Sequence, residues 1–210
     1  MNSDDTTRPR YTSDVAFTPT VKALQAREGS RRAYQRMEQG GSWNTRITPD
    51  LAALLSEQTS VFLATANSAG QPYIQHRGGP RGFLRVVDDT TIGFADFDGN
   101  RQFITHGNLA DNPKAHLFLI DYAERRRVKI WGEARVVDDP EQIASLMPST
   151  CQSRAQRAIL FTVCAWDANC PRHIPQRYDA ADVEAALAQR DARIAALEAE
   201  LAQVRNARAA

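Results

Sequence analysis

The feature that most constrains the fold is a series of strand-like segments that begins at residue 60. Two stretches, SVFLATANSAGQPYIQHR and GFLRVVDDTTIGFADF, each hold a strand, a turn and a second strand, with turns at residues 67–70 and 88–90. Three more strand-like segments follow, AHLFLIDY, RVKIWGEARVV and RAILFTVCAW. A doubly wound parallel sheet needs a helix after nearly every strand, and the sequence does not supply them. The pattern predicts a mainly β fold with helices, built as a small antiparallel barrel.

Helix start signals lie before the strands. A threonine followed by a proline occurs at residues 18–19 and again at residues 48–49, as expected of an N-cap residue before the first helical position. The second start opens a short helix that has leucines on one face. We therefore divide the chain into an N-terminal helical arm (residues 1–47), a barrel (residues 48–178) and a C-terminal helix (residues 179–210).

The C-terminal segment carries apolar residues spaced alternately by four and three positions, which is the spacing of a coiled-coil seam. The alternative is an amphipathic helix packed on its own barrel, but such a helix usually has a wider apolar stripe. The sequence therefore favours a coiled coil, which implies a homo-oligomer, most simply a dimer. The seam positions are Val183, Leu187, Arg190, Ile194, Leu197, Leu201 and Val204.

Composition narrows the classes of partner and compartment. The formal net charge of +1 gives no field that would attract nucleic acid or an anionic membrane. The N-terminal residues MNSDDTTRPR lack the basic start and apolar run of a signal peptide, and no stretch is long enough for a membrane span. Three cysteines cannot all pair, so a disulfide scaffold is not expected. These features predict a soluble cytoplasmic protein.

Polar and basic residues gather where two predicted strands end. His76, Arg77 and two glycines end one strand, and the segment 96–101, DFDGNR, follows a later one. A turn that opens a helix leaves free backbone N–H groups at the positive end of the helix dipole, and arginines beside them suit a phosphate monoester. We expect Arg101 in the first turn of that helix, with Arg77 approaching from the neighbouring strand. A plainer interpretation places both arginines on the surface of an ordinary hairpin.

The order of these parts resembles the FMN-binding split barrels of the pyridoxamine 5'-phosphate oxidase family, over about residues 50–178. The resemblance is carried by the motifs GQPY, GNR…GNLADNPKAHLFLID and RRRVKIWGEARVV. The motifs HRGGPxGF, DFDGN and AWDxNCPxHIPQR are similar to those of one FMN-binding branch of that family. The resemblance implies an antiparallel FMN-binding split β-barrel that pairs into a homodimer, with the flavin in the interface between the subunits.

The resemblance also implies where the flavin lies. Family members hold the FMN phosphate with basic residues on the second strand and at the following helix start, and the isoalloxazine ring packs along the second and a later strand. A residue that follows a charged loop also touches the ring, and the C-terminal part of the barrel reaches the partner's flavin. The cofactor-binding residues implied in this chain are Gln75, His76, Arg77, Gly78, Ala95, Asp96, Asn100, Arg101, Arg127, Trp166, Asn169 and Arg177.

The implied activity is flavin-dependent oxidation or reduction of a small molecule. The residues that pyridoxamine-phosphate oxidases use for the substrate phosphate are not found in this chain, so oxidation of vitamin B6 is not expected. No catalytic residue is assigned. The alternatives are a flavin carrier or sensor that signals through its coiled coil, and a haem-binding split barrel with His106 or His173 as a candidate ligand.

The segment 164–177, CAWDANCPRHIPQR, suggests a metal site when it is taken alone. The spacing of Cys164, Cys170 and His173 matches no common zinc motif and lacks a fourth ligand, so we assign no metal. Cys164 is expected in the core, as part of the last strand. Cys170 and His173 remain open, as a nucleophile with its base or as residues of the flavin pocket.

Overall fold

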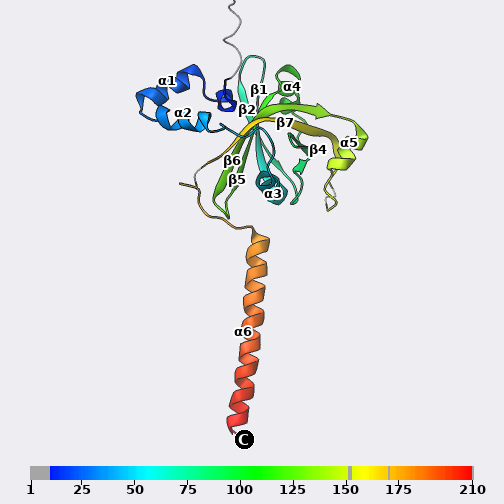
Figure 1. The fold of residues 1–210 in the computed structure, drawn as a ribbon. Helices are drawn as coiled ribbons and strands as arrows, with labels where there is room; N and C mark the ends of the chain where they lie inside the picture. The colour runs from blue at the N-terminus through cyan, green and yellow to red at the C-terminus, as the bar shows by residue number, and fades with distance from the viewer. Residues whose placement is uncertain (1–9, 151–152, 170, 210) are drawn as a thin grey trace, which may run out of the picture. The chain divides into compact units, whose positions relative to one another are not determined.

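The chain forms one seven-stranded antiparallel sheet with the strand order β2-β1-β5-β6-β7-β4-β3 in a computed structural model, which describes residues 10–150, 153–169 and 171–209 (Figure 1). Within these residues β2 and β3 are the two edges, so the sheet is not closed. This architecture confirms the predicted antiparallel split barrel with N-terminal helices and a C-terminal helix. In chain order the elements are η1 (Thr12–Val15), α1 (Pro19–Arg27), α2 (Arg31–Gln39), α3 (Pro49–Glu57), β1 (Ser60–Ala66), β2 (Pro72–Gly78), β3 (Arg85–Val86), β4 (Thr91–Phe97), α4 (Ile104–Asp111), β5 (Lys114–Asp121), β6 (Arg126–Val137), α5 (Pro140–Leu146), β7 (Ala155–Asn169) and α6 (Ala180–Ala209).

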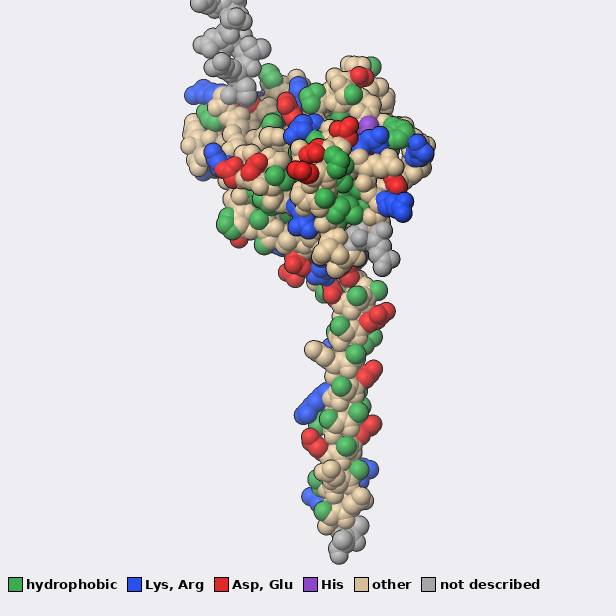
Figure 2. All heavy atoms as spheres, turned by 90° about the vertical axis from the view of Figure 1, so that its right-hand side faces the viewer, with side chains coloured by type: hydrophobic (Ala, Val, Ile, Leu, Met, Phe, Trp, Pro, Cys, Tyr) green, Lys and Arg blue, Asp and Glu red, His purple; other side chains and the backbone are tan. Residues whose placement is uncertain are grey.

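The described residues fall into two compact units. The first holds the N-terminal helices and the sheet, up to Asp121 and again over Arg126–Pro171. The second combines Tyr122–Arg125 with Arg172 and the residues that follow it, α6 included. Apolar side chains lie at the surface of α6 along its length (Figure 2). None of the described helices combines the length and the apolar character that crossing a membrane requires.

The core of the first unit lies between the curled sheet and α3. The N-cap of α3 is Thr48, whose hydroxyl accepts a hydrogen bond from the backbone N–H of Leu51 at 3.3 Å. The helix then buries its three leucines against residues of β1, β4, β5, β6 and β7 in one apolar cluster. The burial of such a side chain contributes roughly 1.5–3 kcal/mol to folding, so the predicted leucine face is what fixes α3 to the sheet.

A second, smaller apolar cluster, which the sequence did not predict, includes residues of α5. Helix α5 begins after Asp139, whose carboxylate accepts hydrogen bonds from two backbone N–H groups of the first turn, as an N-cap residue does. Ile143 and Leu146 of this helix pack with Val137 of β6 and Leu160 of β7. The cluster covers the ends of the two longest strands of the sheet.

The N-terminal helices reach the sheet through aromatic residues. Trp43 stacks on Trp131 of β6, with ring centroids 4.7 Å apart, and Phe17 packs edge-on against Trp43. The ammonium group of Lys129 lies 5.3 Å from the centroid of the Trp131 ring. Both tryptophans are therefore packing residues.

The pairing of β6 with β7 contains an irregularity that corrects one expectation. The register shifts between Trp131 and Gly132, and Cys164 is the extra residue on β7. Val163 and Ala165 are buried, whereas Cys164 is exposed and not in the core. Desolvation and the nearby charge of Glu133 nevertheless raise the pKa of the Cys164 thiol. A raised pKa keeps the thiol protonated and hence poorly nucleophilic at neutral pH.

Candidate functional site

An open pocket lies between the second strand, β4, the start of α4 and the beginning of β7. Its volume is about 230 Å³. Most of its lining is polar or charged, with residues from β2, the loop between β4 and α4, and β7. Five residues expected at the cofactor line this pocket: Gln75, Arg77, Asp96, Asn100 and Arg101.

An ion-pair network centred on Asp96 forms one wall of the pocket. The Asp96 side chain is only 8% exposed, and one of its carboxylate oxygens accepts a hydrogen bond from Nη1 of Arg77. The other oxygen lies 2.6 Å from Nε2 of His106. An ionised carboxylate can only accept hydrogen bonds, so Nε2 of His106 carries the proton in this contact. The network thus joins β2, β4 and α4.

Two further hydrogen bonds hold α4 against the sheet. The Thr105 hydroxyl donates to Oε1 of Gln75 on β2 at 2.8 Å. The Asn108 amide donates to the Thr65 hydroxyl on β1 at 2.9 Å, and both of these side chains are buried. These contacts place the first turns of α4 beside the polar face of β2.

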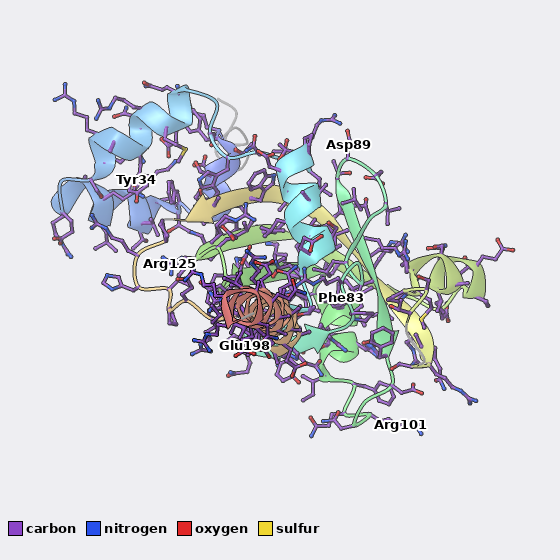
Figure 3. The ribbon with its side chains drawn as sticks, turned by 90° about the horizontal axis from the view of Figure 1, so that it is seen from below. Tyr34, Phe83, Asp89, Arg101, Arg125 and Glu198 are labelled. Atoms are coloured by element: carbon purple, nitrogen blue, oxygen red, sulfur yellow. The ribbon has the colours of Figure 1, made fainter. Side chains whose placement is uncertain are left out.

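The loop before α4 corrects the expected helix boundary. Arg101 was expected in the first turn of this helix, but α4 begins at Ile104. Arg101 and Phe103 instead have left-handed backbone conformations, with φ of 57° and 54°. The local reason is that the Asn100 side chain accepts a hydrogen bond from the backbone N–H of Gln102, at 3.3 Å, which stabilises a turn in place of a helix. Arg101 therefore lies on the loop, where Figure 3 labels it, and is exposed.

The start of α4 has no side-chain cap. Phe103 occupies the N-cap position and provides no side-chain hydrogen bond. The first N–H groups of a helix lack intrahelical partners and carry the positive end of the helix dipole. The guanidinium of Arg157, from β7, lies 5.5 Å from the centroid of the Phe103 ring at this point. The arrangement can bind an anion.

The residues expected on the second strand divide between its two faces. Because side chains alternate along a strand, Gln75 and Arg77 face the pocket, and His76 and Gly78 face the other way. Nε2 of His76 lies 2.8 Å from the hydroxyl of Ser60 on β1, outside the pocket. Ala95 is likewise buried beside Asp96 and does not line the pocket.

Two of the residues expected to come from later in the chain, Trp166 and Arg127, do not line this pocket. The Trp166 indole N–H donates to the backbone carbonyl of Arg46 at 2.8 Å. Arg127 is half-buried on β6 and pairs with Asn169, whose side chain lies outside what the structure describes. Arg177 belongs to the second unit, where its guanidinium lies 4.9 Å from the centroid of the Tyr122 ring. A contact of any of these residues with the flavin of a partner subunit stays a prediction.

The main pocket residue that sequence reasoning missed is Arg157. It pairs with Asp96 across β4 and β7, strands that are more than fifty positions apart in the chain. No local motif marks it, because the contact depends on which strands are neighbours in the sheet. Tyr73 was also missed, although the alternation Tyr73, Gln75, Arg77 on one strand face is a signal that could have found it.

The structure describes one of the two residues whose role the sequence left open, Cys170 and His173. Cys170 lies outside the described residues, and His173 is exposed with a left-handed φ of 64°. Within the described ranges, no three His, Cys, Asp or Glu side chains are grouped so as to hold a metal ion. Burial and the charge of Lys129 lower the pKa of His116, on β5, to about 4.

Comparisons with known proteins agree with this fold. The sequence profile of the pyridoxamine 5'-phosphate oxidase family matches residues 47–170, which is more than half of the chain. A search of curated protein sequences finds no match.

Several solved structures are also similar, at low identity. HupZ of Group A Streptococcus is 19% identical, with a TM-score of 0.47 over 63% of this chain and 99% of that one. A protein of Clostridium acetobutylicum related to general stress protein 26 is 16% identical, with a TM-score of 0.45 over 62% and 92%. An FMN-binding protein of Syntrophomonas wolfei is 11% identical, with a TM-score of 0.44 over 69% and 97%. Likenesses at this level carry no conclusion about what this chain binds. The match to the family profile does settle membership, and the chain belongs to the pyridoxamine 5'-phosphate oxidase family.

Proposed function

We propose that this protein binds FMN and uses it to oxidise or reduce a small molecule. Membership of the pyridoxamine 5'-phosphate oxidase family supports a flavin, and the pocket at the start of α4 supports a phosphorylated one. The substrate phosphate site of the B6 oxidases has no counterpart that we can identify in the sequence. The proposed substrate is therefore a small molecule other than pyridoxamine phosphate.

The observation that carries the proposal is the state of Arg77. Its Nε atom is buried and has no hydrogen-bond partner among the described residues, although the Arg77 side chain as a whole is 16% exposed. A buried donor without a partner costs about 1–3 kcal/mol, which a phosphate oxygen would recover. Arg101 and Arg157 line the same pocket, beside the uncapped start of α4. The residues present therefore fit a phosphate monoester.

The small volume of the pocket supports a flavin site that two subunits share. About 230 Å³ is less than the 300–1,000 Å³ typical of pockets for complete small-molecule ligands. The pocket of one chain suits the phosphate and part of the ribityl chain, and the ring then needs a further surface. We propose that this surface comes from a second subunit of a homodimer, with Arg127, Trp166, Asn169 and Arg177 as the contributing residues.

The roles of the chain's own residues follow from their contacts. Arg77, Asn100 and Arg101 bind the phosphate, and Asp96 orients Arg77 by accepting its hydrogen bond. His106 contacts the other oxygen of Asp96 through Nε2 and so helps to hold this carboxylate in place. The flavin, when bound, supplies the redox chemistry as a two-electron carrier. No residue is assigned as a general acid or base.

The phosphate assignment can be tested by equilibrium titration with FMN and with riboflavin. Arg101→Ala should weaken FMN binding about tenfold, the effect of losing a hydrogen bond to a charged group, and should change riboflavin binding less than twofold. Arg135→Ala is the matched control, because Arg135 is also exposed and does not line the pocket. Equal losses for the two ligands would refute the phosphate site.

A second candidate function is a flavin carrier or sensor, which the exposed apolar residues of α6 favour. Steady-state turnover with a nicotinamide donor and a range of acceptors separates the two functions. Bound FMN that never turns over would support the carrier. A purified protein that holds haem and takes up no FMN would support the haem-binding alternative, in which iron ligation through Nε2 of His106 would have to displace its bond to Asp96.

A further inference from the structure

The C-terminal helix α6 carries a line of large apolar side chains that nothing within its own unit covers. Six of them, from Val183 to Val204, are between 42% and 54% exposed. The helix is 30 residues long, and a single helix in water gains little stability from its backbone alone. Contiguous apolar surface of this kind marks an interaction site. Figure 2 shows hydrophobic side chains, alanines included, along the helix between acidic and basic ones.

The width of the apolar line restricts what can cover it. In heptad notation Leu187, Ile194 and Leu201 occupy a positions, and Val183, Leu197 and Val204 occupy d positions. The b, c and f positions of the described heptads hold alanine, glutamine, asparagine and one aspartate, Asp182, which suit solvent. An apolar seam confined to a and d fits one partner helix, whereas packing on a globular surface uses a wider face.

The charges beside the seam select an orientation. In a parallel, in-register pair of helices, each g residue faces the e residue five positions later on the other helix. That rule places Arg193 opposite the partner's Glu198, and Glu200 opposite the partner's Arg205. Both contacts join opposite charges, and symmetry repeats each of them. The remaining g positions of this series are Ala186 and Ala207, which add no repulsion.

An antiparallel pairing is less favourable. The register that packs Leu187 against the partner's Val204 also places Asp191 beside the partner's Glu198. These two carboxylates repel, and the contact occurs twice. The same register does make attractive contacts, of Arg193 with the partner's Glu200 and of Glu184 with the partner's Arg205, but it packs Arg190 against the partner's Leu201. In the parallel pair, every contact between charged g and e residues of α6 joins opposite charges.

Arg190 is the one polar residue in the seam. It occupies a d position, where a parallel pair brings the two Arg190 side chains into the same layer. The adjacent e residue, Asp191, supplies an opposite charge that flanks this layer in a parallel pair. A polar layer costs stability but penalises every register in which the two arginines face apolar residues.

We propose that α6 forms a parallel, in-register, two-stranded coiled coil with α6 of a second copy of this chain. The seam provides the affinity, and the Arg193–Glu198 and Glu200–Arg205 contacts between chains provide the orientation. Such a coil has its two-fold axis along its own length, which is compatible with a symmetric dimer. The proposal concerns α6 alone and does not depend on the flavin.

Disulfide cross-linking of the full chain tests the orientation. In a background where the three natural cysteines are replaced by serine, V204C chains should link to one another on mild oxidation, because equivalent d positions face each other. A mixture of L187C chains and V204C chains should give only like-with-like links. A dominant mixed link would show an antiparallel coil and overturn the proposal. Absence of any link between chains would show that something else covers α6, and would overturn it as well.

Charge reversal tests the specific pairs. R193E puts a carboxylate opposite the partner's Glu198, and should slow the V204C link and lower the melting temperature of α6 by several degrees. The double variant R193E/E198R restores opposite charges and should recover both values. Q189E, at an outward c position, is the control and should leave both near the starting protein. A double variant no better than the single would contradict the assigned pairing.

Discussion

At the residue scale, the site depends on how Asp96 shares its two oxygens. One binds Arg77 and the other binds His106, so a single carboxylate on β4 fixes side chains from β2 and α4. The pair with Arg77 neutralises a guanidinium that is mostly removed from water. Asp96 thus keeps a largely buried charge tolerable when the phosphate is absent.

Asp96→Asn tests this function of the carboxylate. The substitution leaves Arg77 without its counter-ion, and should lower the free energy of unfolding by about 3 kcal/mol. Added FMN should stabilise the variant more than the starting protein, since the phosphate then supplies the missing negative charge. Thermal unfolding with and without FMN measures both effects. Asp98→Asn, an exposed acid of the same pocket, is the control, and equal behaviour of the two variants would contradict this role for Asp96.

The lowered pKa of His116 should make the stability of the protein depend on pH. Burial and the charge of Lys129 lower its pKa to about 4 in the folded chain, against 6.5 in the unfolded one. Between pH 4 and pH 6.5 the unfolded chain binds a proton on His116 that the folded chain does not bind. The contribution of neutral His116 to the free energy of unfolding is therefore fully present above about pH 6.5 and is lost as the pH drops toward 4. Allowing for partial exposure, the loss should be on the order of 2 kcal/mol.

Urea unfolding at pH 7.5 and pH 4.5 measures this loss. His116→Gln removes the titrating group and should make the difference between the two pH values smaller. His173→Gln, at an exposed position, should leave the difference as it was. If His116→Gln has no effect on the difference, another group is responsible for the acid sensitivity.

At the scale of elements, the long pairing of β6 with β7 depends on a glycine. A Cβ atom added to Gly132 would lie 2.1 Å from the backbone carbonyl oxygen of Thr162 and 2.5 Å from the Phe161 ring. No side chain fits there unless the strands separate. The glycine therefore permits the close approach of the two strands at the register shift.

Gly132→Ala should consequently lower the free energy of unfolding by about 2–3 kcal/mol, as overpacking in a core does. Gly107→Ala is the contrasting substitution, because a Cβ at that position in α4 meets no atom within 4 Å. Alanine is favoured over glycine in a helix, so Gly107→Ala should raise stability by about 0.5–1 kcal/mol. Chemical denaturation gives the free energy of unfolding of both variants. A Gly132→Ala variant as stable as the starting protein would contradict the close packing at this glycine.

The sequence predicted elements where the signal was local. The Thr-Pro starts located α1 and α3, and the alternating segments located the strands, because capping and side-chain alternation act over a few residues. It did not locate the start of α4, where the Asn100 turn and two left-handed residues displace the helix to Ile104. Arg157 could not be assigned to the pocket, since its position depends on the pairing of β4 with β7.

At the scale of the whole molecule, the outward face of β2, β1 and β5 is the surface that we expect to form the main dimer contact. Ile74 is 60% exposed on this face, next to the half-buried ring of Phe62. The register places Phe118 beside Phe62 on the neighbouring strand. An apolar surface of this kind on a sheet is typical of an interface between subunits.

A chain that ends at residue 178 should therefore remain a dimer, with the α6 pair adding stability but not creating the dimer. Light scattering of the shortened protein should give the mass of two chains across the micromolar range. The full-length chain is the control at the same concentrations. A shortened protein that is monomeric would show that α6 alone holds the two chains together.

FMN binding is tested most directly by the absorption spectrum of the purified protein, together with the mass of the cofactor released on unfolding. We expect a flavin spectrum and a released molecule with the mass of FMN, or, if the protein is purified empty, stoichiometric uptake of added FMN in preference to riboflavin. Colourless protein that takes up no added FMN would contradict the proposed binding of FMN.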